Sequence, residues 1–175
     1  MEGLKAVGIR GFNLTMPNKI RIMDLVDHIS PVSRICRSIN TVVNDDGVLT
    51  GTSTDGIGYM EALHDAGYDV TGEEITMMGG GGASTAICAQ AALDGIRHIH
   101  IFRPSFQPLY QRTLELADTI NRTTPCRASV YDHADLTSLR QALSRSRLLI
   151  NGTPVAWRPT PDIPSSRTPP CSTKI

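Results

Sequence analysis

The stretch Ile75-Thr76-Met77-Met78-Gly79-Gly80-Gly81-Gly82-Ala83-Ser84 decides the fold class that this 175-residue sequence predicts. Its first four residues form a short apolar run typical of a buried strand, and four glycines follow. An alanine-rich helical segment then continues to about Leu93, where Gly95 provides a stop signal. Strand, glycine turn and helix form the context of a dinucleotide-binding loop, in which backbone N–H groups and a helix N-terminus face a pyrophosphate. A merely flexible glycine turn is the alternative.

Downstream of this loop, strand and helix patterns continue to alternate. Strands are predicted at residues 98–102, 128–131 and 148–150. Apolar positions spaced as on one helical face predict helices between them, around residues 109–120 and 136–143. This β-α-β-α-β-α-β order predicts a parallel sheet with right-handed crossovers, so the fold class is α/β.

Upstream of the loop, the pattern is different. Residues 39–43 and 48–52 are predicted strands, and Asp45-Asp46-Gly47 between them is a hairpin signal. Pro17 suits the first turn of a helix that we expect to run through Ile22, Leu25 and Val26. Apolar residues between positions 56 and 66 predict a further helix, which would connect the two regions.

Composition excludes several classes of function. Seventeen basic and 17 acidic residues give a formal net charge of zero, so nothing favours a nucleic-acid or anionic-membrane partner. The sequence has neither an apolar run of transmembrane length nor a signal peptide's apolar stretch. The cysteines, without a Cys-x-x-Cys pair, predict free thiols in a cytoplasmic protein. The histidines lack metal-ligand spacing, and His98 and His100 predict a strand with one polar face rather than a metal site.

Two further runs each end in a single ionisable residue after small and turn-forming residues. One is Gly11-Phe12-Asn13-Leu14-Thr15-Met16-Pro17-Asn18-Lys19, and the other is Gly51-Thr52-Ser53-Thr54-Asp55-Gly56. A cation and a carboxylate are what a hydroxyl-to-ketone redox reaction needs beside a hydride carrier. Taken singly, a lysine after proline is usually a solvated helix residue, and an aspartate before glycine is usually a turn or cap.

The wording of these runs resembles the signatures of the shikimate dehydrogenase family. Residues 39–47, Ile-Asn-Thr-Val-Val-Asn-Asp-Asp-Gly, are most similar to its quinate/shikimate dehydrogenase branch. The resemblance implies NAD(P)-dependent oxidation of shikimate or quinate to the 3-dehydro acid. It implies catalytic roles for Lys19 and Asp55, which we expect to pair across a cleft between the two regions. With Thr15 and Asn40, these two residues are also expected to bind the substrate. The cofactor-binding residues indicated by the glycine loop and the resemblance together are Gly79, Gly80, Gly81, Gly82, Ala83, Ser84, Arg103, Asn151 and Thr153.

The resemblance also suggests how the chain is organised. Residues 1–55 are expected to form a partial substrate-binding region, 56–72 a linker helix and turn, and 73–158 a truncated Rossmann-like parallel sheet with flanking helices. Residues 159–175, rich in proline and serine, predict a disordered tail. The family's N-terminal Ser-x-Ser segment and C-terminal part have no counterpart here. We therefore expect a fragment of low turnover, able to associate through exposed edges or as a homodimer.

Cofactor choice depends on the residues just after the second strand of the predicted sheet. No acidic residue stands there to hold the ribose hydroxyls of NAD, whereas Arg103 is suited to the 2′-phosphate of NADP. The sequence thus favours NADP, with NAD as the alternative. Two functional alternatives also stay open, a nucleotide-binding module without catalysis and an inactive remnant.

Overall fold

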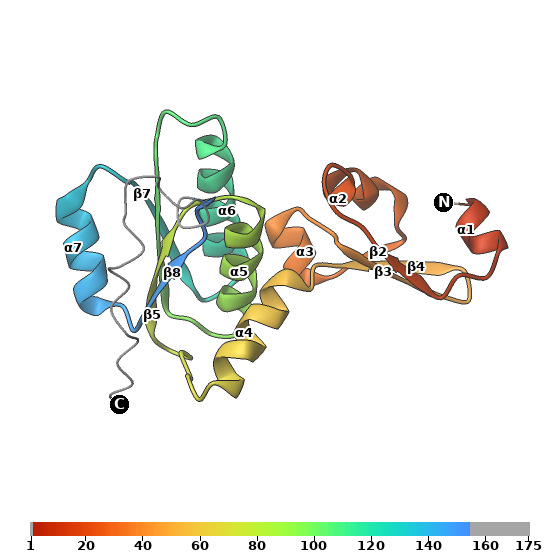
Figure 1. Cartoon of the computed structure of the whole chain (residues 1–175), viewed down its shortest axis with the longest axis horizontal. Helices are drawn as coiled ribbons and strands as arrows, with labels where there is room; N and C mark the ends of the chain where they lie inside the picture. Colours follow the sequence, from red (N-terminus) through yellow and green to blue (C-terminus); the bar gives the residue numbers. More distant parts are fainter. Residues whose placement is uncertain (1, 155–175) are drawn as a thin grey trace, which may run out of the picture.

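A computed structural model describes residues 2–154, which form two four-stranded sheets joined by helices (Figure 1). The N-terminal sheet holds β1 to β4, and the parallel sheet holds β5 to β8. The first part of the chain comprises α1 (Glu2–Ala6), β1 (Gly11–Asn13), α2 (Asn18–Arg21), the 3-10 helix η1 (Ile22–Leu25), β2 (His28–Ile29), α3 (Pro31–Cys36), β3 (Thr41–Asp45), β4 (Val48–Thr52) and α4 (Asp55–Asp65). The second part comprises β5 (Glu74–Met78), α5 (Gly82–Leu93), β6 (His98–Arg103), α6 (Tyr110–Thr123), β7 (Arg127–Asp132), α7 (Leu136–Arg145) and β8 (Leu148–Asn151).

The N-terminal sheet has the strand order β1-β3-β4-β2, with β2 parallel to β4 and the other pairs antiparallel. The hairpin predicted between β3 and β4 is confirmed. Asp46 and Gly47 take φ values of 50° and 92°, the two successive left-handed residues that match the twist of a tight hairpin. Ile39, Val42 and Leu49 form the small core beneath this sheet.

The helix expected to run from Pro17 through Val26 is shorter than predicted. α2 ends at Arg21, η1 continues to Leu25, and Val26 is extended, with a φ of −107°. The physical reason lies in the next strand. The N–H of Asp27 donates to the carbonyl oxygen of Leu49 at 2.9 Å, so the chain must be extended there to reach β4.

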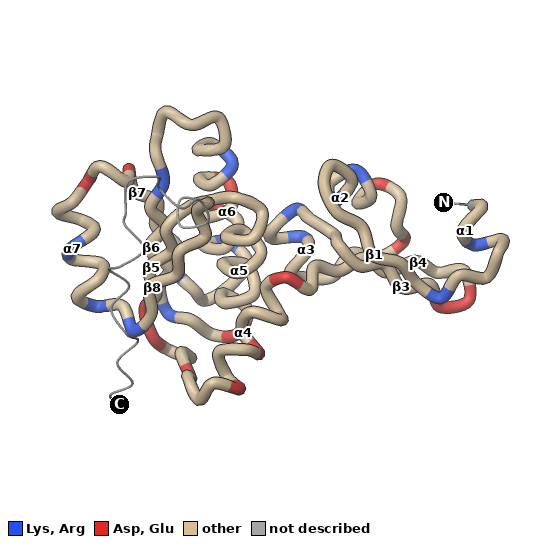
Figure 2. The backbone as a smooth tube through the Cα atoms, in the orientation of Figure 1, with Lys and Arg blue, Asp and Glu red and all other residues tan. Residues whose placement is uncertain are grey.

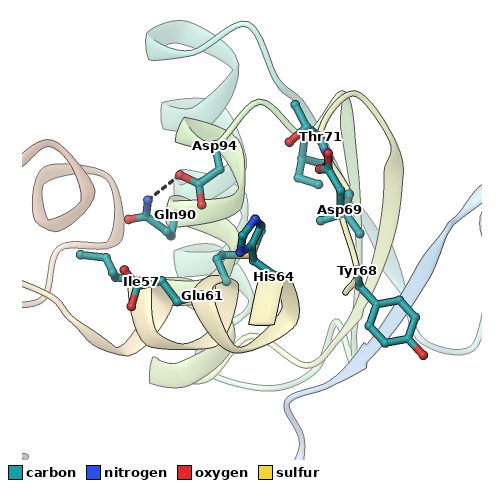
Figure 3. Close-up of a pocket in the computed structure, with 11 residues that line it drawn as sticks. Ile57, Glu61, His64, Tyr68, Asp69, Thr71, Gln90 and Asp94 are labelled. Atoms are coloured by element: carbon teal, nitrogen blue, oxygen red, sulfur yellow. Dashed lines mark hydrogen bonds between the residues drawn. The ribbon is translucent and has the colours of Figure 1, made fainter. Parts of the chain in front are cut away.

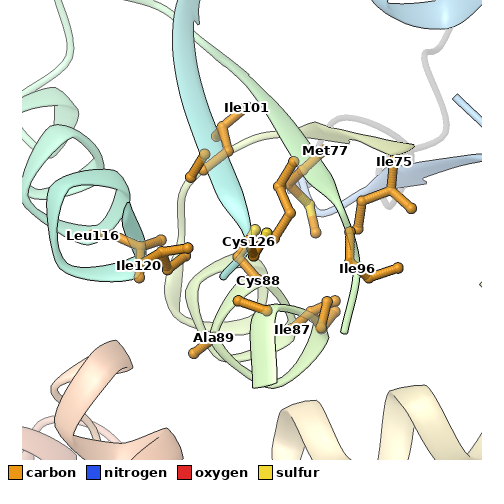
Figure 4. Packing of buried hydrophobic residues seen from close by; sticks show 14 of the residues in the cluster. Ile75, Met77, Ile87, Cys88, Ala89, Ile96, Ile101, Leu116, Ile120 and Cys126 are labelled. Atoms are coloured by element: carbon orange, nitrogen blue, oxygen red, sulfur yellow. The ribbon is translucent and has the colours of Figure 1, made fainter. Parts of the chain in front are cut away.

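The parallel sheet has the order β7-β6-β5-β8, and all of its pairs are parallel. The predicted α/β class, with a Rossmann-like sheet and flanking helices, is confirmed. α5 and α6 cover one face and α7 lies on the other (Figure 1). Beneath α5 and α6, aliphatic side chains interlock with two buried thiols, as Figure 4 shows for a group that includes Ile75, Met77, Ile101, Cys88 and Cys126.

The other face of the parallel sheet is polar, as the alternation of His98 and His100 predicts. His98 Nε2 lies 3.0 Å from the Ser129 hydroxyl. His100 is fully buried, and its Nε2 lies 2.9 Å from a carboxylate oxygen of Glu74. Because each buried polar group has a partner, this face costs little to bury under α7.

Basic and acidic positions both occur in each half of the described chain, and the acidic ones are most frequent around α4 (Figure 2). No helix within residues 2–154 combines the length and apolar character that crossing a bilayer requires. The tail predicted at residues 159–175 lies outside the described residues.

The polar sheet face makes stability sensitive to acid. Burial, with a smaller contribution from His100, lowers the pKa of His98 to about 4 from its ordinary value of 6.5. Between these values the unfolded chain binds the proton that the folded chain refuses, so stability should fall as the pH drops from about 6.5 towards 4. Urea unfolding across this range should show a shallower decline in His98→Gln than in the parent. Parallel pH curves for the two proteins would contradict this assignment.

Candidate functional site

The glycine loop connects β5 to α5 in a backbone conformation that needs its glycines. Gly79 has a φ of +103°, which side chains rarely adopt. An atom placed at the Cβ position of Gly80 would lie 2.5 Å from the Thr113 hydroxyl and 2.9 Å from Arg103 Nη1. Gly81 caps α5 in an extended conformation, with open space where a side chain would project. The loop therefore rests on Arg103 and Thr113 below and presents Gly81 above.

An ion pair is the polar centre of the N-terminal half. Lys19 Nζ lies 2.8 Å from Asp55 Oδ2, which is the pairing that the two sequence runs predict. Asp55 is the first residue of α4, where a negative charge is favoured by the helix dipole. Its second oxygen accepts a hydrogen bond from Asn40 Nδ2 at 2.8 Å. The carboxylate is thus held from two sides, by a cation and by an amide.

One cleft brings the ion pair and the glycine loop together. This central cleft, of about 610 Å³, is lined by Met16, Lys19, Ile20, Cys36, Ser38, Asp55, Tyr59, Gly80, Gly81, Gly82, Ala83, Thr85, Ile87, Leu109 and Arg112. Its walls come from α2, α3, α4 and α5 and from the start of α6. Since the loop's N–H groups and the Lys19–Asp55 pair share a single cavity, a ligand on the loop has access to the pair.

A second pocket, of about 790 Å³, lies at the carboxyl ends of the parallel strands. This edge pocket is lined by Met78, Gly79, Gly80, Gly81, Phe102, Arg103, Pro104, Gln107, His133, Leu149, Asn151, Gly152, Thr153 and Pro154. Gly80 and Gly81 line both cavities, so the glycine loop lies between the central cleft and the edge pocket and forms part of the wall of each. Ligands of open parallel sheets bind at this edge.

Arg103 is the charged group of the edge pocket that lies deepest. It ends β6 and is 6% exposed, and its Nη2 donates to Gln107 Oε1 at 3.0 Å. Its Nε is buried without a hydrogen-bond partner, and burial lowers the pKa of its guanidinium. Arginine nevertheless stays protonated. A buried cation that has no carboxylate within reach in the described chain suits an anionic ligand.

The remaining sequence-predicted residues take three kinds of position. Asn151 Oδ1 accepts bonds from the N–H and the hydroxyl of Thr153, at 3.0 and 2.7 Å, and shapes the loop after β8. Ser84 is buried and packs on Gly152, so it supports the pockets without lining them. Thr15 is exposed and lies next to Met16, outside the lining of the central cleft.

Asn40 has a different environment from the one expected for a residue free to contact substrate. Its amide nitrogen donates to Asp55 and, at 3.1 Å, to the Thr54 hydroxyl, while its oxygen accepts from the Thr54 N–H at 3.0 Å. The side chain therefore orients Asp55. A direct bond from Asn40 to a substrate stays a prediction.

Sequence reasoning missed several residues that line the two cavities. Tyr59 lies one helical turn after Asp55, and Arg112 lies in the first turn of α6 and lines the same cleft as the glycine loop. The i, i+4 spacing from Asp55 was a usable signal for Tyr59. Gln107 and His133 reach the edge pocket from turns after β6 and β7, and only the sheet order brings those turns together.

Two other clusters of titratable groups do not make a convincing ligand site. A pocket of about 280 Å³ between α4 and α5 presents Glu61, Asp69 and Asp94, but Asp94 already accepts from Gln90 and Asp69 from the backbone of Thr71 (Figure 3).

The other cluster brings ligand atoms of Glu74, His98 and His100 within 4.8 Å of one another. Arg97 and Arg145 lie 3.1 and 3.6 Å from the Glu74 carboxylate. These two guanidinium groups neutralise the carboxylate and repel a metal cation.

A Rossmann-like sheet whose glycine loop faces a lysine–aspartate pair across a cleft is an arrangement typical of α/β dehydrogenases. Known proteins narrow this class. The family model for the shikimate dehydrogenase substrate binding domain matches residues 1–42. The shikimate dehydrogenase (NADP(+)) of Listeria monocytogenes serotype 4b (strain F2365) is 44% identical over 159 residues, which are 91% of this chain and 54% of the relative.

Two further similar proteins carry related names. A quinate/shikimate dehydrogenase of Escherichia coli O139:H28 is 40% identical over 91% of this chain and 55% of its own length. The crystal structure of shikimate 5-dehydrogenase from Listeria monocytogenes in complex with shikimate and NAD has a TM-score of 0.85 at 44% identity, over 87% of this chain and 53% of that one. Over most of its length, the chain is therefore similar to shikimate dehydrogenases. It spans about half the length of the curated relatives it matches.

Substitution by alanine should affect stability differently at Gly80 and at Gly81. Gly80→Ala forces a methyl group against Arg103 and Thr113, so we expect a loss of about 1–3 kcal/mol of unfolding free energy. Gly81→Ala meets open space at a negative φ and serves as the matched control, with stability unchanged or slightly raised. Denaturant unfolding measures both, and equal losses would contradict this description of the loop.

Proposed function

We propose that this chain carries the cofactor- and substrate-binding centre of an NAD(P)-dependent shikimate or quinate dehydrogenase. The observation that carries the proposal is the single cleft shared by the Lys19–Asp55 pair and the glycine loop. A hydroxy acid beside the pair would lie next to a dinucleotide on the loop. The printed names of the relatives, which include shikimate, quinate, NAD and NADP, support the same pairing of ligands.

In this proposal residues 1–55 form the substrate-binding region, 56–72 the linker, and 73–158 the cofactor-binding domain. The small, antiparallel-rich N-terminal sheet and the parallel sheet each have their own core cluster, which supports the division. Thr15 and Asn40 assist Lys19 and Asp55 in binding the substrate. The glycine loop, Ala83, Ser84, Arg103, Asn151 and Thr153 form the cofactor side.

The chemistry divides simply between the two partners of the ion pair. When bound, the nicotinamide supplies hydride transfer. The hydroxyl being oxidised must lose its proton as the hydride leaves, and in reverse the new alkoxide needs a cation beside it. The Lys19 amino group exchanges this proton with the substrate oxygen, taking it in the direction of oxidation and, as the ammonium, returning it in the direction of reduction, while Asp55 accepts a hydrogen bond from a substrate hydroxyl. Asn40 keeps the carboxylate aimed at both.

Residence in the cytoplasm is part of the proposal. It is supported by Cys36, Cys88 and Cys126, which are buried and unbridged in the described chain. Association through an exposed edge, including homodimer formation, is supported by Leu136 and Leu149, which are 59% and 53% exposed on α7 and β8.

The function is tested by following NADPH formation from NADP⁺ with shikimate and with quinate. Lys19→Met should abolish the reaction while leaving NADP⁺ binding in place, because the lysine contacts the substrate side of the cleft. Lys5→Met is the matched control, since Lys5 also pairs with an aspartate, Asp27, at 3.4 Å but does not line the central cleft.

The alternatives predict other results. Binding of NADP⁺ with no turnover in the parent would favour a nucleotide-binding module. Binding of neither cofactor nor substrate would favour an inactive remnant and refute the proposal.

Preference for NADP over NAD is expected from Arg103. Its guanidinium gains a charge-assisted contact only with the 2′-phosphate, so NADP⁺ should bind roughly ten-fold more tightly. High salt should reduce the difference. Arg103→Ala should remove it and leave NAD⁺ affinity near that of the parent, whereas Arg140→Ala, an exposed arginine on α7, should keep it. Calorimetric titration measures the affinities of the parent and of both variants for NADP⁺ and NAD⁺. Equal affinities of the parent for the two cofactors would contradict this role of Arg103.

A further inference from the structure

The turn after β7 places a second basic group beside Arg103. The backbone N–H of His133 donates to the carbonyl oxygen of Arg103 at 3.2 Å, which extends the β6–β7 pairing by one more bond. Both side chains line the edge pocket. Their relative position is therefore set by the sheet itself and not by a mobile loop.

His133 is also fixed in orientation. Its Nδ1 lies 3.1 Å from Asp132 Oδ1, and the Phe106 ring packs edge-on against the imidazole at a centroid distance of 6.2 Å. The hydrogen bond to Asp132 occupies one ring nitrogen and leaves Nε2 available to a ligand in the pocket. The turn after β6 is tied to the same carboxylate, because the Ser105 N–H donates to Asp132 Oδ2 at 3.0 Å.

We propose that His133 is a second determinant of NADP specificity, which contacts the 2′-phosphate together with Arg103 when its imidazole is protonated. The inference rests on the proposed dinucleotide function and adds a residue and a pH dependence to it. Histidine changes charge between about pH 5 and 8. NADP preference should accordingly rise as the pH falls.

The neighbouring charges act in the same direction. Hydrogen bonds from Ser105, then from Ala134, hold the pKa of Asp132 at about 2, so its carboxylate is charged over the whole range. With neutral His133, that carboxylate disfavours a phosphate nearby. With protonated His133, the pair is neutral and Nε2–H becomes a donor. Asp135 is engaged elsewhere, since it caps α7 through the Ser138 N–H, and Arg103 supplies the constant positive charge.

In the alternative role, the His133 side chain would contact the adenine ring or maintain the shape of the edge pocket. Such a role would affect NAD and NADP alike, because both carry the same adenine. The ratio of the two dissociation constants therefore separates a phosphate contact from a structural one. The 2′-phosphate also takes up a proton near pH 6, and comparison with a variant removes this contribution because the ligand is the same.

The experiment measures NADP⁺ and NAD⁺ dissociation constants by calorimetry near pH 5.5 and near pH 8. Near pH 8 the NADP preference of His133→Gln should match that of the parent. Near pH 5.5 the preference of the parent should exceed that of the variant by roughly five-fold. His64→Gln is the matched control, since His64 lies 4.0 Å from its neighbour Asp65 but lines neither of the two cavities.

Each other outcome overturns the inference. Identical pH profiles in parent and His133→Gln refute the contact, and so does an equal loss of NAD⁺ and NADP⁺ affinity. Failure of the parent to bind either cofactor refutes the proposed function itself, and that result is distinct from binding with an unchanged profile. If His133→Gln unfolds, His133→Asn and the half-ligands adenosine 2′,5′-bisphosphate and AMP give the same comparison.

Discussion

The close approach of α4 to α5 is the constraint on which the site depends. A side chain at Gly56 would collide with the carbonyl of Ala86, so only glycine lets the two helices pack at this distance. Asp55 immediately precedes this contact, and the glycine loop immediately precedes α5. One helix crossing therefore places the carboxylate beside the loop. The same crossing joins the two halves of the molecule, because α4 links the small N-terminal sheet to the parallel sheet, and α3 and α5 lie between the two sheets (Figure 1).

Glycines at two other points allow a similar approach at the opposite side of the loop. A side chain at Gly79 would lie 3.1 Å from the Gly152 carbonyl oxygen, and one at Gly152 would collide with Ser84. These contacts lie between β5 and β8, where the chain order of the parallel sheet reverses direction. The crevice at such a reversal is open because the connections on its two sides diverge. Backbone crowding and an open crevice thus arise from the same topology.

Much of this arrangement was predictable from local sequence, and the reasons are physical. The strand before Gly79, the helix after Gly82 and the hairpin at Asp46 each depend on residues close in the chain. The pairing of Lys19 with Asp55 came from motif wording, because nothing local links positions so far apart. Val26 was misassigned because a backbone bond to β4, invisible in the helical pattern, decides its conformation.

The residues that sequence analysis did not find share one property, which is that their role exists only after the chain has folded. Gln107 and His133 line one pocket because β6 and β7 are neighbours. Asn40 was predicted as a substrate contact, but its bond to Asp55 could not be predicted, because it forms only where the residue before β3 meets the start of α4.

For Arg103, in contrast, the sequence predicted the position of the residue but not the environment of its side chain. The sequence predicted it at the end of a strand, but its position against Gly80, next to Thr113 of α6, follows only from the fold. A buried guanidinium without a carboxylate partner loses solvation that its hydrogen bond to Gln107 restores only in part, since Nε has no partner in the described chain. Part of the protein's stability is therefore given up to hold a cation where an anion can reach it. The proposed dinucleotide site would account for that loss, and it would also account for the position of the glycine loop directly against Arg103.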